Sequence, residues 1–166
     1  YIEPQRSHNF SLGYFQNFDD NRWETSAEVY YRLIDELFDY RDFADLTLNP
    51  RLETELLAGE GRAYGLELSL KRKTGRLNGW VSYTFSRSEL QIPGINEGRW
   101  YPTNFDKPHN LSVVFNVLLN QRNTLSFNFN YRTGRPLTAP VSSYTLESGL
   151  SVPDYSLRNQ YRIPDY

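Results

Sequence analysis

Residues 110–133 read NLSVVFNVLLNQRNTLSFNFNYRT, and they show the pattern of the fold most clearly. Hydrophobic side chains occupy every second position on both sides of a short polar segment at 120–123, as Val113 and Phe115 do before it and Phe127 and Phe129 after it. Alternation with a period of two residues is typical of β-strands that have one apolar face. The stretch therefore predicts two antiparallel strands, at 110–119 and 124–133, joined by a tight turn.

The same pattern occurs twice more in the sequence. Strands are predicted at 7–18 and 23–34, and again at 62–73 and 77–87, with a short polar turn inside each pair. Long connections are predicted at 35–61, 88–109 and 134–166. We therefore predict an all-β fold, an antiparallel up-and-down meander of about six long strands. The strands are roughly twice as long as those of soluble sheets.

The two faces of these strands differ sharply in polarity. One face is hydrophobic at most positions, and its charged residues, among them Arg72 and Arg87, lie at strand ends. The other face is rich in Asn and Ser. Charges are costly in the middle of a lipid-facing strand and cheap at its ends. Long strands joined alternately by short and long connections are typical of outer-membrane barrels. A soluble β-barrel or β-sandwich, with its apolar face turned inward, shows the same alternation.

Composition excludes several classes of protein and of site. The 166 residues carry a net charge of −2, which does not favour a nucleic-acid partner, and contain no Cys, which removes disulfides and Cys-ligated zinc. The sequence has no apolar run long enough for a transmembrane helix. The two histidines, His8 and His109, are far apart in sequence, and Glu24 and Glu28 on one strand would be about 13 Å apart. We predict no enzymatic activity, no metal site and no cofactor.

Two long connections carry unusual residues. In the segment 35–60, acidic residues far outnumber the two arginines, Arg41 and Arg51. This segment is either a ligand-contacting loop or simply a solvated acidic loop. The segment 88–108 contains Trp100, Tyr101 and Phe105, which are candidate ligand contacts because exposed loop aromatics stack on ligands. The alternative is that they pack into the mouth of the barrel.

Three segments together resemble a known family: GRAYGLEL at 61–68 leading into GWVSYTFSRS at 79–88, NFDKPHNL at 104–111, and NYRTGRP at 130–136. They are similar to successive hairpins near the C-terminal end of the β-barrel in TonB-dependent receptors of the Gram-negative outer membrane. The type that they resemble carries a carboxypeptidase-regulatory-like domain ahead of its plug.

The resemblance implies that the chain is a fragment of a transmembrane β-barrel of about 22 strands, filled by its own N-terminal plug domain. The function implied is active transport of a nutrient (a siderophore, glycan or peptide), driven by TonB acting through the plug. The expected partners are outer-membrane lipid, the plug and TonB, and the resemblance leaves room for a surface lipoprotein. A passive porin or another outer-membrane barrel, or a soluble β-sandwich binding module, is the alternative.

Residues on the polar face would line the lumen in such a barrel. They either contact the plug or belong to a part of the wall that faces only water. The lumen-facing candidates are Glu67, Trp80, Asn116, Asn128 and Arg132.

Overall fold

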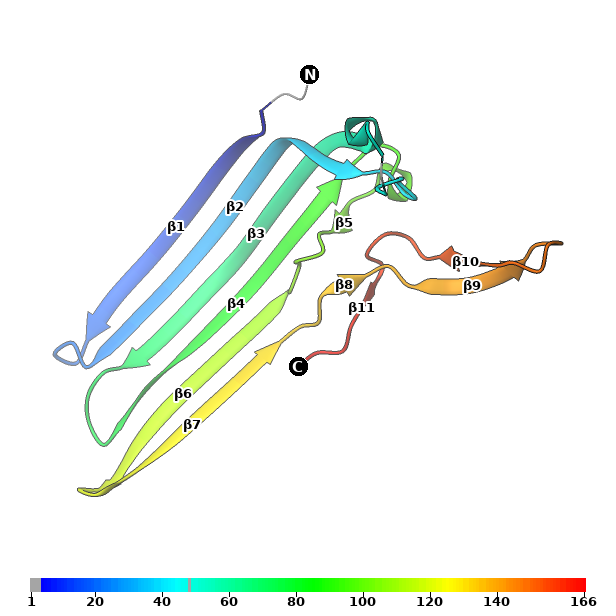
Figure 1. Cartoon of the computed structure of the whole chain (residues 1–166). Coiled ribbons are helices and arrows are strands. Elements are labelled where there is room, and N and C mark those ends of the chain that lie inside the picture. The colour runs from blue at the N-terminus through cyan, green and yellow to red at the C-terminus, as the bar shows by residue number, and fades with distance from the viewer. Residues whose placement is uncertain (1–3, 48) are drawn as a thin grey trace.

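The computed structural model describes residues 4–47 and 49–166 and shows one large antiparallel sheet with smaller elements at one end (Figure 1). The long strands follow one another in the sheet in chain order, which confirms the predicted all-β meander. They are β1 (Arg6–Phe18), β2 (Trp23–Tyr40), β3 (Leu56–Arg72), β4 (Leu77–Gln91), β6 (His109–Asn120) and β7 (Asn123–Arg132). The smaller elements are the 3₁₀ turns η1 (Leu52–Glu55) and η2 (Asn96–Gly98), and the short strands β5 (Tyr101–Pro102), β8 (Pro136–Leu137), β9 (Pro140–Thr145), β10 (Ser151–Tyr155) and β11 (Tyr161–Arg162).

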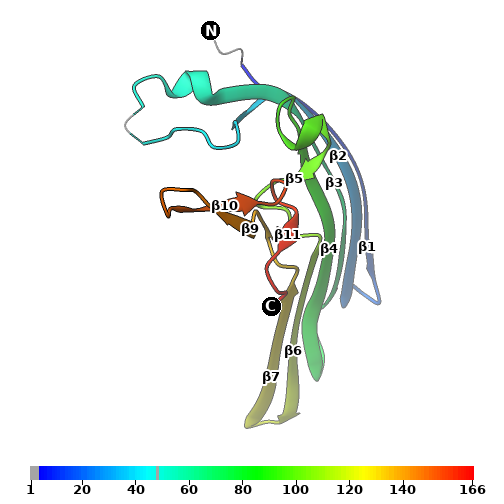
Figure 2. The same cartoon turned by 90° about the vertical axis from the view of Figure 1, so that its right-hand side faces the viewer.

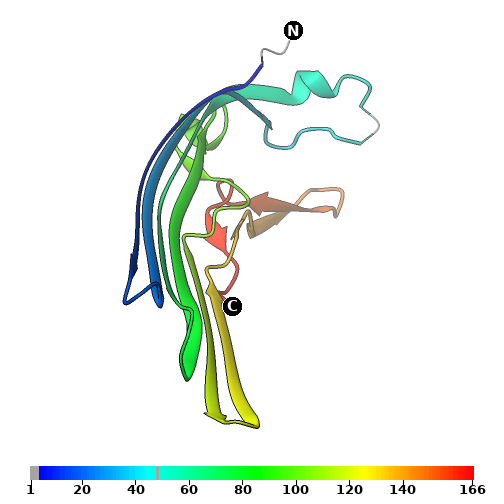
Figure 3. The ribbon, with the colours of Figure 1, turned by 90° about the vertical axis from the view of Figure 1, so that its left-hand side faces the viewer.

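All three short turns lie at one end of the sheet, and all long connections lie at the other (Figure 1). The tight turn between β1 and β2 uses left-handed backbone at Asp19, Asp20 and Asn21, which Asn and Asp tolerate better than most residues. The sheet is strongly curved, and β8–β11 lie on its concave side (Figures 2 and 3). The short strands and the long connections therefore gather at one end of the concave side.

Strand register identifies which face is concave. Leu90 in β4 pairs with Gly61 in β3, and it therefore lies on the same face as Glu67 and Ser82, the polar face. Leu90 packs with Ile92 and Ile95 of the β4–β5 connection and with Tyr101 of β5, and these segments lie over this face. The polar face is therefore concave, and the apolar face is convex.

The apolar side chains of the convex face do not converge on a common interior. Phe10 is 64% exposed and Phe127 is 53% exposed, and Leu12, Leu68 and Leu125 are also exposed. Among the described residues, the buried hydrophobic core is confined to the rim at the long-connection end, where Leu90, Ile92, Ile95 and Tyr101 pack together. In a β-sandwich, a second sheet would cover the apolar face, but among the described residues β8–β11 lie on the opposite, concave face (Figures 2 and 3).

Two strands run well beyond the ends that alternation predicts. β2 continues through Tyr40, and β3 begins at Leu56, so the predicted connection at 35–61 is wrong at both of its ends. The physical reason is a register shift between Ile34 and Leu37, with left-handed backbone at Glu36. The extra residue interrupts the period of two while pairing resumes at Leu37.

The other two predicted connections also contain paired strand. β4 extends to Gln91 and β5 pairs with it, within the predicted connection 88–109. The predicted connection 134–166 contains β8–β11, in which β9 pairs with β10 and β8 pairs with β11. These strands are at most six residues long, which is too short to show a clear alternation in sequence.

The outer edges of β1 and β7 have no partner strand in the described part of the chain. Six strands cannot close a membrane barrel, for which the minimum is about eight. The curved sheet therefore has the form of a wall segment of a larger barrel. Within the described residues, the structure shows no helix with the length and apolar character needed to cross a membrane.

Candidate functional site

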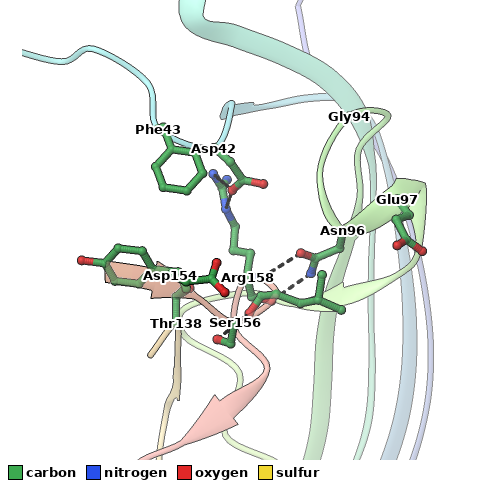
Figure 4. Close-up of a pocket in the computed structure, with 11 residues that line it drawn as sticks. Asp42, Phe43, Gly94, Asn96, Glu97, Thr138, Asp154, Ser156 and Arg158 are labelled. Atoms are coloured by element: carbon green, nitrogen blue, oxygen red, sulfur yellow. Dashed lines mark hydrogen bonds and ion pairs between the residues drawn. The ribbon is translucent and has the colours of Figure 1, made fainter. Parts of the chain in front are cut away.

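A cavity of about 480 Å³ opens on the concave side, among the long connections (Figure 4). Three segments that are distant in sequence form it: the β2–β3 connection, the β4–β5 connection and the C-terminal segment 134–166. Its lining residues are Asp42, Phe43, Gly94, Asn96, Glu97, Thr138 and residues 154–158. A cavity of this size is in the range that holds small ligands.

Arg158 joins the C-terminal segment to the β2–β3 connection. Its Nη1 donates to Asp39 Oδ2 at 2.8 Å and to the Tyr40 carbonyl at 2.7 Å, and its Nε donates to Asp42 Oδ1 at 3.0 Å. Its Nη2 lies 2.7 Å from the same Asp42 oxygen. Burial disfavours the charged guanidinium, but the carboxylates of Asp39 and Asp42 outweigh it and raise the pKa of Arg158. Every nitrogen of the guanidinium is therefore engaged within the protein.

Side-chain amides attach the C-terminal segment at residues 158 and 159 to the β4–β5 connection and to β5. The Arg158 N–H donates to Asn96 Oδ1 at 2.7 Å, and Asn96 Nδ2 donates to the Arg158 carbonyl at 2.9 Å. Asn159 Nδ2 donates to the Pro102 carbonyl at 2.7 Å. We call Asp39, Asp42, Asn96, Arg158 and Asn159 the rim clasp, because together they hold the three segments that form the cavity.

Tyr101 supports the rim clasp from the small hydrophobic core. Its hydroxyl donates to Asp39 Oδ2 at 3.2 Å. Burial, followed by the negative charge of Asp39, raises the pKa of Tyr101 well above its ordinary value of 10.0. The hydroxyl therefore stays protonated and continues to donate its hydrogen bond at physiological pH.

A second group of contacts attaches the end of the chain to the sheet. Arg162 is paired with the fully buried carboxylate of Asp106, which also accepts a hydrogen bond from the Ser88 N–H at 2.8 Å. Arg162 Nη1 donates to the carbonyls of Asp106 and Gly134. The chain at Ile163 crosses so close to Gly134 that a Cβ there would overlap the Ile163 carbonyl. The C-terminal segment is thus fixed over the rim by ion pairs and by close backbone contact.

Two aromatic rings stand at the cavity beside these polar groups. The centroids of Phe43 and Tyr155 are 6.4 Å apart, with ring planes tilted by 59°. The carboxylates of Asp42, Glu97 and Asp154 line the same cavity. The arrangement presents ring surfaces and hydrogen-bond acceptors to a ligand, but no free guanidinium.

The five lumen-facing candidates all lie on the concave face, spread along the wall below the cavity. Glu67 lies directly opposite Glu28 in the neighbouring strand, and Trp80 lies opposite Lys71. The other three bond to polar neighbours on the same face. Asn116 donates to Asn78, Asn128 accepts from Asn130, and Arg132 donates to Asn110. The structure brings none of the five to the cavity.

The three loop aromatics lie in three different environments. The Trp100 ring lies 4.1 Å from the guanidinium carbon of Arg62, which is paired with Glu89 on the convex face. Tyr101 is buried in the rim core, and Phe105 is 88% exposed. The structure therefore does not bring these three residues together into one site.

The pattern of the sequence does not single out the residues that form the cavity. Asp42 and Phe43 lie in the acidic connection, and residues 154–158 lie in a segment that showed no pattern. The one signal available was the acidic excess of 35–60. The structure shows that Asp39 and Asp42 pair with Arg158, and that Glu55 is buried against Arg41, with Oε2 2.6 Å from its Nε.

No group of three His, Asp or Glu residues is placed to hold a metal ion in the part of the chain that the structure describes. No curated protein and no solved structure matches the chain. A family model described as TonB dependent receptor-like, beta-barrel matches residues 1–166, the whole chain. Proteins of this family are transporters of the Gram-negative outer membrane. The chain belongs to the TonB-dependent receptor β-barrel family.

Proposed function

We propose that this chain forms part of the wall and of the extracellular substrate-binding rim of a receptor that actively takes up a nutrient (a siderophore, glycan or peptide). The observation that carries the proposal is the position of the cavity. The segments that line it lie on the concave, polar side of the sheet, at the end where the long connections gather (Figure 2). In an outer-membrane barrel the long connections are extracellular, and a substrate arriving from outside would meet this end first.

The convex face supports the same placement of the chain. It presents exposed Leu, Val, Phe and Tyr side chains along the strands. Rings such as the stacked pair Phe18–Trp23 lie beside a short turn, and the stacked pair Tyr31–Tyr64 lies toward the long connections. Aromatic residues near both ends of the strands fit the two interfacial girdles of a transmembrane barrel. Outer-membrane lipid is therefore the partner that we propose for this face.

The test of the cavity uses the full-length receptor as the only copy in its host. Nutrients that depend on it are identified first, by comparing growth of the deletion strain and the wild type on siderophores, glycans and peptides. We expect the double variant Phe43→Ala/Tyr155→Ala to lower uptake of that nutrient about tenfold, because both rings border the cavity. Tyr144→Ala is the matched control, an exposed aromatic residue of β9 that does not line the cavity, and should change uptake less than twofold.

Equal uptake by the double variant and the wild type, at equal amounts of receptor in the outer membrane, would overturn the assignment of the cavity. Loss of uptake in Tyr144→Ala as large as in the double variant would also overturn it, because the effect would then not be specific to the cavity.

We also propose that Glu67, Trp80, Asn116, Asn128 and Arg132 face the receptor's own plug, through which TonB would act. A photo-crosslinking residue placed at Trp80 should capture the plug, whereas one at Val81, on the convex face, should not. This result separates energy-coupled uptake from a passive porin, which has no plug to capture. Capture of the plug from position 81, or from neither position, would contradict the proposal.

A further inference from the structure

The charges around the cavity are unbalanced toward negative. Three carboxylates line it, from Asp42, Glu97 and Asp154. Asp42 is paired with Arg158, which also binds Asp39, and Glu97 is paired with Arg99. Asp154 makes no ion pair within the described part of the chain, and its Oδ2 accepts one hydrogen bond, from Ser142 Oγ at 3.0 Å. A ligand therefore meets the uncompensated carboxylate of Asp154 and, among the described residues that line the cavity, no cation that lacks a carboxylate partner.

The aromatic rings at the cavity are also uncovered. Phe43 is 85% exposed and Tyr155 is 44% exposed, so much of each ring is open to a ligand. The cations that stack on rings elsewhere are Arg62, Arg72 and Lys107, and among the described residues none stacks on either of these two rings. The face of an aromatic ring attracts an ammonium or guanidinium group. The rings and the carboxylates of this cavity therefore both favour a positively charged ligand.

We propose that this cavity binds a cationic ligand, one that presents an alkylammonium or guanidinium group to Asp154 while its chain or head lies against Phe43 and Tyr155. This inference rests on the proposed function and narrows its substrate class. An anionic ligand would find each nitrogen of Arg158 already engaged. The ligand with the best complementarity is a peptide that contains Lys or Arg, or a polyamine.

The test is a calorimetric titration of the full-length receptor in detergent with three probes, the peptide tri-lysine, the peptide tri-glutamate and the neutral sugar maltotriose. We expect binding of tri-lysine alone, weakened by raising NaCl from about 0.05 M to about 0.5 M because salt screens exposed charges. Asp154→Asn should weaken tri-lysine binding roughly twofold to fivefold, the range measured for exposed ion pairs. Phe43→Ala should have an effect of similar size, from loss of the ring surface.

Two controls accompany these variants. Asp154→Glu keeps the carboxylate and should bind tri-lysine nearly as the wild type does. Asp20→Asn removes a carboxylate from the short turn between β1 and β2, at the opposite end of the sheet, and should leave binding unchanged. Spermidine in place of tri-lysine distinguishes a polyamine from a peptide, because it carries the ammonium groups without a peptide backbone.

The inference is overturned if tri-lysine does not bind, if tri-glutamate or maltotriose binds more tightly, or if Asp154→Asn binds tri-lysine as the wild type does. In each of these cases the proposed function still stands if Phe43→Ala/Tyr155→Ala lowers nutrient uptake. If that double variant also leaves uptake unchanged, the proposed function fails as well.

Discussion

Replacing Arg158 by Met should loosen the attachment of the C-terminal segment to the rim. The side chain is only 18% exposed and is bonded to two carboxylates and a carbonyl, and Met has similar length but no charge. Hydrogen bonds to charged groups contribute about 1.5–3 kcal/mol. Asp42 is 44% exposed, and solvent therefore weakens its interaction with Arg158. We expect a loss of about 2 kcal/mol in the free energy of local opening, most of it from the Asp39 contact.

Hydrogen exchange in the full-length receptor measures this change directly. The amide of residue 158 donates to Asn96, and that of Asn159 donates to Thr138 Oγ1. A loss of about 2 kcal/mol corresponds to about 30-fold faster exchange at both amides, if they exchange by local opening. Arg158→Lys keeps the charge but cannot form the same fork of bonds, and should give a smaller acceleration.

Arg22→Met is the matched control, because Arg22 forms an exposed ion pair with Asp19 at 3.7 Å in the turn before β2. This variant should change exchange at residues 158 and 159 less than twofold. If Arg158→Met leaves both amides within twofold of their wild-type rates, the account of the rim clasp is refuted.

Three further predictions concern the lipid face, the chain crossing and the rim. Leu68→Arg, on the convex face, should cost up to about 2–4 kcal/mol and reduce the folded receptor found in outer membranes by immunoblot, whereas Ser69→Arg on the concave face should not. Gly134→Ala should lower the melting temperature and speed exchange in the C-terminal segment, because the new methyl overlaps the Ile163 carbonyl. Burial raises the pKa of Tyr101 above its ordinary value of 10.0 in the folded protein. Above pH 10 the hydroxyl therefore ionises more readily in the opened form than in the folded form. The stability that Tyr101 contributes is complete below pH 10 and declines as the pH rises above 10. Tyr101→Phe should remove that part of the alkaline decline in the melting temperature.

Each of these three predictions has a result that would contradict it. Equal yields of Leu68→Arg and Ser69→Arg would mean that the two faces are not distinguished by lipid. An unchanged melting temperature in Gly134→Ala would mean that the chain does not cross closely at this point. Identical pH profiles for Tyr101→Phe and the wild type would mean that the hydroxyl is not buried against Asp39.

The long strands could be predicted from the sequence because their alternation is nearly unbroken. Phe127 and Asn128 show it clearly, since one is apolar and lies on the convex face and the other is polar and lies on the concave face. Alternation fails as a guide at the register shift after Ile34, where one extra residue exchanges the two faces. Strand pairing nevertheless resumes at Leu37 and continues to Tyr40, with the two faces exchanged. A prediction based on the period alone therefore ended β2 too early.

The cavity could not be predicted because its contacts join residues that are far apart in the chain. Arg158 lies 119 residues from Asp39 and 116 from Asp42, and no local pattern links them. Loop residues such as Asn96 take their positions from the folded rim rather than from any periodicity. The lengths of the connections predict at which end of the sheet the long loops gather, and this is the end at which the cavity lies. The sequence did not indicate which residues of these loops would meet.

The convex face should contact lipid and the concave face should contact water and the plug, and labels attached to single cysteines distinguish these environments. The chain has no cysteine, so Phe127→Cys and Asn128→Cys each add one unique attachment point in this part of the receptor for a spin label. In receptor reconstituted into bilayers, the label at 127 should be relaxed by oxygen, which concentrates in lipid, and shielded from a water-soluble nickel reagent. The label at 128 should be shielded from lipid-dissolved oxygen. The opposite pattern at these two neighbouring positions would contradict the account.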